Sequence, residues 1–282
     1  LVLVKNIVDG TLQDPWSGII ATISLFLAFL AVSFRNDYTD HMIGVDRVST
    51  HSGSRVIQSG LLTAKQIKNM GDIALLCALV LAIPVTLVQP RVVYWILAAF
   101  ALGTFAQFQA RKSFKFRIGG ELLLFLLVGP LLSTGYQVAL GGQVDPDSLI
   151  IGLLWGWLVM FIHELSLLVD IVVYSRAGFR NTVTVLGFDL ARRVLAFWWT
   201  LFVVFYFFYH LFFGGTYWGW YFSIALILLT PRLVLKFKSV ESPIGSDLLA
   251  LYRTGKNYFL LAIAVWSLEN LWYLWSTYNW RP

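Results

Sequence analysis

The chain has 282 residues, of which 58% are hydrophobic, 16% aromatic and only 13% charged. Soluble proteins carry about 25% charged residues, so this composition excludes an ordinary soluble domain and indicates a polytopic membrane protein. The net charge of +6 at pH 7 raises the question of a nucleic-acid partner, which the distribution of the basic residues answers.

Apolar runs long enough to cross a bilayer, which takes about 20 helical residues, occur eight times. They cover residues 15–34, 72–89, 91–109, 118–140, 148–173, 194–213, 217–235 and 254–276. We expect residues 1–8 to be the outer end of a further helix whose beginning precedes the sequence. The prediction is an all-α membrane bundle of nine transmembrane helices, the first one truncated, forming a single domain over residues 1–282.

Eighteen of the twenty-one Lys and Arg residues lie in four connecting segments, at 35–71, 110–117, 174–193 and 232–256. The other connections are nearly free of basic residues. By the positive-inside rule, the basic segments face the cytoplasm. Topology thus explains the positive charge, and we expect a lipid bilayer and no nucleic acid as the chain's surroundings.

Three carboxylates, Asp37, Asp40 and Asp46, follow the first long apolar run directly. Asn36 and Asp40 are four residues apart and therefore share one helix face, with Asp37 beside them. Hard oxygen ligands clustered in this way suit Mg²⁺, which prefers one or two carboxylates and the oxygens of a phosphorylated substrate. The sequence therefore predicts Mg²⁺ ligands at the cytoplasmic end of this helix.

The segment that follows this motif contains His51-Ser-Gly-Ser-Arg55. Gly53 permits unusual backbone angles and the serines offer hydrogen-bond donors to phosphate oxygens, so the segment can lie across a site; it can equally be a plain linker. Arg55 favours the functional reading, because a guanidinium can hold a diphosphate with two parallel hydrogen bonds.

A second group of polar residues enters the apolar run at 148–173. Ser166, Asp170 and Tyr174 are spaced four apart and share a face of the predicted helix. Ionisable groups at membrane depth are costly and are functional candidates by default. For His163 and Glu164 a hydrogen bond to another helix explains the residues equally well, whereas Asp170 lies near the cytoplasmic end and favours a functional role.

These two acidic groups, each on the cytoplasmic end of a helix, resemble those of the UbiA superfamily of intramembrane prenyltransferases. In that family an Asn-Asp-x-x-Asp motif follows the second helix of a nine-helix bundle, and Asn36, Asp37 and Asp40 match it. The residues around Asp46 and after Arg55 look most like the 1,4-dihydroxy-2-naphthoate branch, which makes menaquinone precursors. The resemblance covers nearly the whole chain.

The family's second motif, Asn-x-x-x-Asp-x-x-x-Asp, is matched only in part. Asp170 stands where its first Asp is expected, but Ser166 replaces the Asn and Tyr174 replaces the last Asp. A phenol, with a reference pKa of about 10, thus stands at the expected metal site. Glu121 resembles an acidic position on the fifth helix of relatives, and the sequence assigns it no role.

The resemblance implies a Mg²⁺-dependent transfer of an isoprenyl group from an isoprenyl diphosphate to an aromatic acceptor, such as a dihydroxynaphthoate-like quinone precursor. Mg²⁺ would neutralise the departing diphosphate, and aromatic walls would shield the allylic cation. The implied residues fall into two groups. Metal binding and catalysis fall to Asp37, Asp40 and Asp170, with Asp46 as a further ligand, and substrate binding to Asn36, Arg55, Lys112, Ser166, Tyr174 and Arg180.

Position 174 leaves a second reading open, in which the chain is an inactive UbiA-like subunit that binds a lipid or a quinone in a membrane assembly. A transporter is disfavoured, because the charged groups cluster at the cytoplasmic rim and few lie near the midplane where transporters bind their substrates. The sequence identifies no protein partner, isoprenyl chain length or acceptor.

Overall fold

A computed structural model describes residues 2–8, 10, 12, 15–44, 54–107, 117–212 and 217–279. Its described part is helical, with one isolated bridge between Arg117 and Arg180, so the all-α prediction is confirmed there. The helices, in chain order, are α1 Val2–Val8, α2 Pro15–Ile43, α3 Ala64–Val88, α4 Val92–Gln107, α5 Gly120–Leu126, the π-helical η4 Leu127–Leu131, α6 Leu132–Ala139, α7 Pro146–Val169, α8 Ile171–Arg176, α9 Thr182–Phe212, α10 Tyr217–Ser239 and α11 Ser246–Asn279.

Six helices in the described part are long and apolar enough to span a bilayer: Pro15–Ile43, Ala64–Val88, Gly120–Ala139, Pro146–Val169, Thr182–Phe212 and Gly219–Ser239. The predicted count of nine is not confirmed. Within the described residues, α1 comprises seven residues, the apolar part of α4 covers Val92–Gly103, and α11 is not among the six. Large apolar side chains such as Phe29, Leu87 and Leu228 are exposed on these helices, as expected for an integral membrane protein whose outer surface meets lipid.

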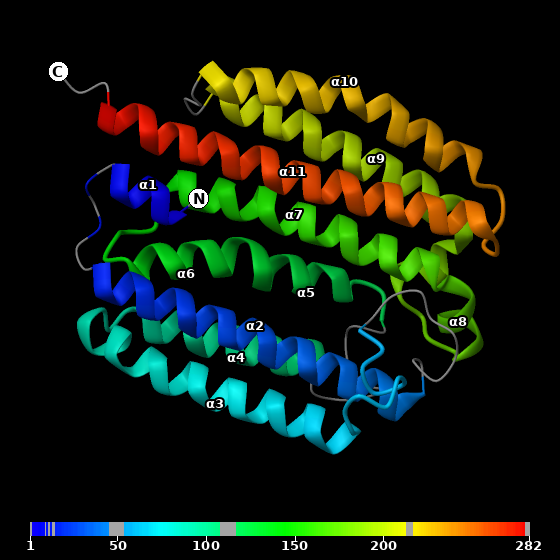
Figure 1. Ribbon diagram of the computed structural model, residues 1–282, viewed down its shortest axis with the longest axis horizontal. Helices are drawn as coiled ribbons and strands as arrows, with labels where there is room; N and C mark the ends of the chain where they lie inside the picture. Colours follow the sequence, from blue (N-terminus) through cyan, green and yellow to red (C-terminus); the bar gives the residue numbers. More distant parts are fainter. Residues whose placement is uncertain are drawn as a thin grey trace.

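The long helices lie roughly side by side (Figure 1). Their buried side chains form two apolar clusters. The larger cluster joins α7, α9, α10 and α11 around fully buried rings that include Phe161, Trp199 and Tyr206. The smaller cluster joins α2, α3, α4 and α6 through small and branched side chains such as Ala21 and Val85. The α5–η4–α6 rod runs between the two groups of helices.

Local signals in the sequence fix several helix boundaries. Thr63 begins α3 with a reciprocal capping box to Gln66, and Asp145 begins α7 in the same way through Ser148, with Pro146 in the first turn. Both arrangements satisfy backbone amides that have no partner inside the helix. Gly187 turns the backbone of α9 with a φ of 74°, which separates the short first turn from the long rod that follows.

A close helix crossing joins η4 to α7 through glycines on both sides. A Cβ atom added at Gly152 would lie 2.8 Å from the Cα of Pro130 and 2.9 Å from the carbonyl oxygen of Gly129. Small residues at such crossings let membrane helices approach closely, which supplies packing where the hydrophobic effect contributes little. This contact sets the position of α5, and therefore of Glu121, relative to α7.

We expect Gly152→Ala to lower the melting temperature in detergent, because the added methyl group must push η4 away from α7 at a cost of about 1–3 kcal/mol. Gly103→Ala is the matched control, because a Cβ atom there meets nothing within 4 Å. Equal melting temperatures for the two variants would contradict the close crossing.

Candidate functional site

The first motif lies on a helix that extends well past the apolar run. The predicted connecting segment 35–71 is helical at both ends, because α2 continues to Ile43 and α3 begins at Ala64. Likewise, the segment 174–193 consists largely of α8 and the start of α9. Figure 1 shows the last turns of α2, the first turn of α3 and the junction of α7 and α8 at the same end of the bundle.

Asn36, Asp37 and Asp40 lie close together on α2, with Asn36 and Asp40 four residues apart on one face, as their spacing predicts. The Asn36 amide donates a hydrogen bond to Asp40 Oδ2 over 3.2 Å, and the Asp40 side chain is buried, with 6% exposure. Asp37 is half-buried and accepts a 2.5 Å hydrogen bond from the Ser54 hydroxyl. Burying one ionised carboxylate beside a second is unfavourable unless a positive charge lies nearby. This end of α2 is therefore suited to bind a cation.

An ion pair holds this turn against the neighbouring helix. Arg35 directly precedes Asn36 on α2, and it donates to Asp72 on α3. The pair is partly buried on both sides, where water screens an ion pair less than at the surface. The pair therefore fixes the rotation of α2, and with it the face that carries Asp37 and Asp40. Sequence analysis did not identify Asp72.

Ser54 and Arg55 begin the described part of the chain that returns from the motif to α3. Arg55 has a φ of 55°, in the left-handed region that few residues other than glycine adopt. Its carbonyl oxygen accepts from the Ser59 amide at 2.9 Å and closes a turn, while its side chain is exposed. Strained backbone of this kind concentrates at ligand-binding sites, and here it stands one residue from the Asp37 partner.

The second motif differs in shape from the sequence prediction. Helix α7 ends at Val169, and Asp170 has φ −106° and ψ 17° before α8 begins at Ile171. The expected continuous helical face through Ser166, Asp170 and Tyr174 is therefore wrong, because the backbone breaks at its centre. Asp170 is 2% exposed, and its carbonyl oxygen accepts from the amides of Val173 and Tyr174, which starts the new turn.

The two residues that depart from the family motif, Ser166 and Tyr174, have structural partners. The Ser166 hydroxyl donates to the His163 carbonyl oxygen of its own helix at 2.6 Å. Tyr174 is 5% exposed, belongs to the larger apolar cluster, and packs edge-on against Phe179 with 6.3 Å between ring centroids. The phenol at the position of the expected carboxylate therefore contributes packing to this end of the bundle.

Glu121 joins three segments behind the second motif. Its carboxylate accepts from the backbone amide of Thr182 at 3.2 Å and from the Thr182 hydroxyl at 2.8 Å. The Glu164 side chain on α7 lies close to the Glu121 carboxylate. Glu121 thus ties α5 to the start of α9 beside α7, and a backbone bridge joins Arg117, before α5, to Arg180, before α9.

Several predicted site residues are not brought into one metal cluster. Asp46 and Lys112 lie outside the described residues, and Arg180 is exposed. Within the described ranges, no three Asp, Glu, His or Cys side chains gather closely enough to hold a metal ion. In the described part, Asp37 and Asp40 lie near the end of α2, and Asp170 lies between α7 and α8. Their carboxylates are therefore separate oxygen donors at the same end of the bundle.

Sequence analysis missed two buried polar features. Asn181 is fully buried and caps α9 by accepting from the Thr184 amide at 2.8 Å; Asn is a favoured residue at this position. At the opposite end of the bundle, the Tyr206 hydroxyl donates to Glu269 at 2.6 Å, and His210 Nδ1 lies 3.2 Å from the same carboxylate. Ionisable residues inside apolar runs were the signal for this cluster.

Comparison with known proteins identifies the family. Two solved structures share the fold. One, from a study of digeranylgeranylglyceryl phosphate synthase in membranes, is 14% identical, with a TM-score of 0.60 over 95% of this chain and 91% of that chain. The other, a UbiA homologue from Archaeoglobus fulgidus bound to GPP and Mg²⁺, is 16% identical, with a TM-score of 0.59 over 90% and 89%. No curated protein matches. Because residues 7–260 match the UbiA prenyltransferase family, the chain belongs to that family.

Proposed function

We propose that this protein transfers an isoprenyl group from an isoprenyl diphosphate to an aromatic acceptor within the membrane, in a reaction that depends on Mg²⁺. The observation that carries the proposal is the turn of α2 with Asn36, Asp37 and Asp40, which ends an apolar span at the same end of the bundle as Asp170. Family membership and the GPP and Mg²⁺ in the Archaeoglobus homologue support the choice of ligand.

The donors at the end of α2 fit a magnesium ion that is shared with a substrate. Mg²⁺ in phosphate-binding sites takes one or two protein carboxylates and fills its remaining positions with phosphate oxygens and water. Asp37 and Asp40 can supply those carboxylates, with Asp170 as a further donor, while Ser54 and Asn36 orient them. When bound, the ion stabilises the negative charge that develops on the departing diphosphate.

The chain's own residues would have three roles. The exposed Arg55 side chain would donate to diphosphate oxygens beside the Asp37 turn, as a guanidinium can in a bidentate geometry. The apolar interior of the bundle would take the isoprenyl tail and keep water from the allylic cation. Aromatic side chains near the second motif, among them Tyr174 and Phe179, would face that cation with their ring electrons.

The acceptor we propose is a dihydroxynaphthoate-like quinone precursor, on the basis of the residues near Asp46 and Arg55 in the sequence. We also propose that the site opens to the cytoplasm, because the segments around it carry most of the Lys and Arg residues.

Tyr174 favours a second candidate function, an inactive member of the family that binds a lipid or a quinone as part of a membrane assembly. Its ring is buried in the larger apolar cluster at the position where relatives carry a carboxylate. Such a protein would keep the fold and bind an isoprenoid chain, but it would lack a donor for the metal. Turnover by the wild-type protein separates the two candidates.

Asp37→Asn and Asp40→Asn should each reduce Mg²⁺-dependent transfer of a labelled isoprenyl group to dihydroxynaphthoate by about a hundredfold or more, the usual effect of losing one charge-stabilising group. The fold should survive, because an asparagine at position 40 can still accept from Asn36. Asp247→Asn, a loss of the same charge at an exposed site on α11, should leave the rate unchanged. Full activity in either motif variant would rule out the proposed role.

Arg55→Ala should weaken the binding of an isoprenyl diphosphate by about 1.5–3 kcal/mol, because a charge-assisted hydrogen bond is lost. Alanine keeps the Cβ atom, so the strain of the left-handed backbone stays similar. Arg253→Ala, at another exposed arginine, is the control for the change in net charge. Calorimetric titration measures both, and an unchanged affinity would exclude Arg55 from the site.

Tyr174→Phe should keep both the melting temperature and the transfer rate, because the ring contact with Phe179 remains. Tyr174→Asp should lower the melting temperature, since it places a carboxylate in an apolar cluster. A folded Tyr174→Phe variant without activity would show that the phenol acts in catalysis. A wild-type protein that shows no turnover at any Mg²⁺ concentration would favour the inactive subunit.

A further inference from the structure

A groove on the outside of the bundle separates α9 from α10. Its lining residues come from both helices: Arg192, Arg193, Ala196, Phe197 and Thr200 from α9, and Val234, Phe237 and Lys238 from α10. The groove has a volume of about 340 Å³. Because Phe197 is 60% exposed on a helix that spans the membrane, this side of the bundle faces lipid.

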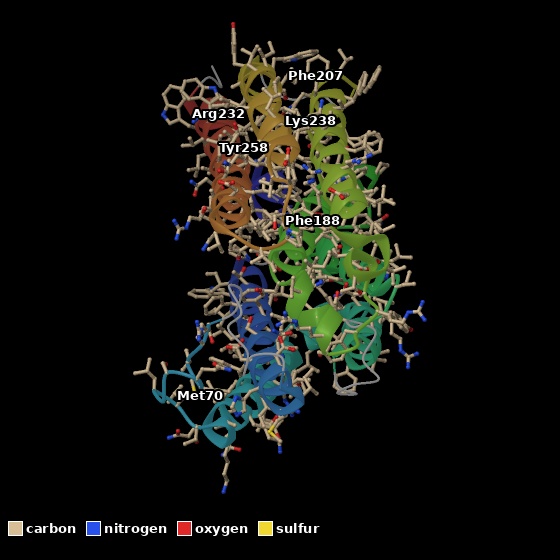
Figure 2. The ribbon with its side chains drawn as sticks, turned by 90° about the vertical axis from the view of Figure 1, so that its right-hand side faces the viewer. Met70, Phe188, Phe207, Arg232, Lys238 and Tyr258 are labelled. Atoms are coloured by element: carbon tan, nitrogen blue, oxygen red, sulfur yellow. The ribbon has the colours of Figure 1, made fainter. Side chains whose placement is uncertain are left out.

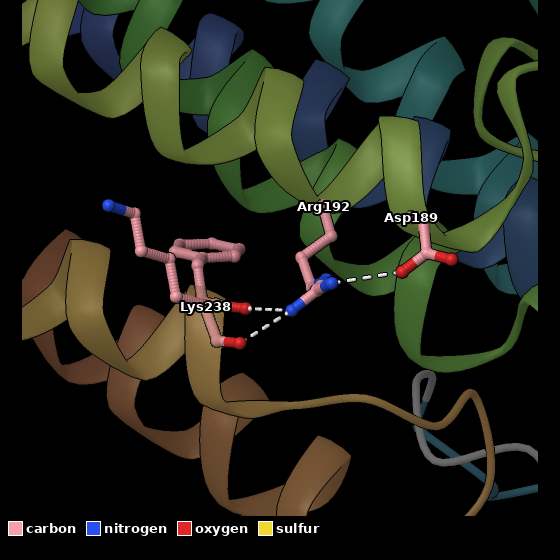
Figure 3. Close-up of polar contacts among 4 residues, drawn as sticks. Asp189, Arg192 and Lys238 are labelled. Carbon is pink, nitrogen blue, oxygen red and sulfur yellow. Dashed lines mark hydrogen bonds and ion pairs between the residues drawn. The ribbon is translucent and has the colours of Figure 1, made fainter.

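Arg192 forms the inner wall of this α9–α10 groove (Figure 3). One guanidinium nitrogen, Nη1, donates to the carbonyl oxygens of Phe237 and Lys238 at 2.8 Å each, and Nη2 donates to Asp189 at 2.9 Å. Its side chain is only 11% exposed. The guanidinium therefore neutralises the partial negative charge at the C-terminal end of α10, which would otherwise repel an anion.

Two further cations stand on the rim of the α9–α10 groove. Arg193 and Lys238 are exposed, and neither side chain forms an ion pair or a hydrogen bond with the residues that the structure describes. Figure 2 labels Lys238 on α10 at this side of the bundle. Of the three basic side chains, Arg192 is paired with the carboxylate of Asp189, and the lining contains no acidic residue, so the groove has an excess of positive charge.

The two ends of the α9–α10 groove differ in chemistry: one is basic and the other is apolar. Its basic groups lie near the start of α9 and in the last turn of α10, at the end of the bundle that carries the aspartate motif. Its apolar side chains, Ala196, Phe197 and Val234, lie further along the helices toward the middle of the membrane. A ligand that matches this lining is anionic at one end and apolar at the other.

We propose that the α9–α10 groove binds an anionic phospholipid, with the headgroup phosphate at Arg193 and Lys238 and an acyl chain along Phe197 and Val234. Basic pockets between membrane helices at the level of the headgroups suit such lipids. The long side chains of Arg and Lys reach the headgroups while their methylene groups stay against apolar surface. A bound lipid would bridge the N-terminal part of α9 and the C-terminal part of α10. The proposed lipid site does not depend on the proposed transferase activity.

Native mass spectrometry of the detergent-purified protein in an equimolar mixture of dioleoyl phosphatidylglycerol and dioleoyl phosphatidylcholine tests this proposal. The wild type should retain the anionic lipid preferentially. The double variant Arg193→Gln/Lys238→Gln should bind it about thirtyfold more weakly, the factor that corresponds to about 1 kcal/mol for each basic residue at a membrane surface. Both side chains are exposed, so the variant should fold.

The matched control is Arg253→Gln/Lys256→Gln, which removes the same charge from exposed positions on α11 and should bind like the wild type. Equal retention of the two lipids by the wild type would overturn the proposal, as would equal losses in both double variants. Complete displacement of phosphatidylglycerol by inorganic phosphate would also overturn it, because a free anion would then suffice.

Discussion

The free-energy cost of placing an ionised carboxylate in hydrocarbon limits where this chain can bind charged ligands. An uncompensated charge there costs several kcal/mol, so the acidic residues that the proposed function needs must lie at the ends of the membrane helices. Asp37 and Asp40 meet this requirement because α2 continues beyond its apolar span. Asp170 meets it because α7 ends there. This placement fits the proposed ligand, which has an apolar tail and a charged headgroup.

Close packing and hydrogen bonds hold these ends in place. The glycine crossing between η4 and α7 brings α5 near enough for Glu121 to reach both Glu164 and Thr182. On the other side, Arg35 and Asp72 join α2 to α3. Each motif is thus held by a partner on a neighbouring helix. In the proposed reaction, such partners would keep the donors oriented toward the place where charge develops.

Residue spacing predicted the helical character of the described chain, six of the eight apolar spans and the shared helix face of Asn36 and Asp40, because these depend on local periodicity. It failed at Asp170, where the backbone leaves the helical conformation between Ser166 and Tyr174. Residue spacing also could not identify the partners of Glu121 and Arg35, because those partners lie on other helices. At Tyr174 the motif suggests a contact with the substrate, and the structure adds an edge-on ring contact with Phe179 that residue spacing does not indicate.

The central claim is that the aspartate end of the bundle binds a diphosphate together with Mg²⁺. Calorimetric titration of the purified protein with a non-reactive isoprenyl thiodiphosphate, with Mg²⁺ and with a chelator, tests it most directly, because binding is measured without turnover. The account predicts binding that requires Mg²⁺ and is lost in Asp40→Asn. Equal affinity in the presence of the chelator, or an unchanged affinity in that variant, would contradict it.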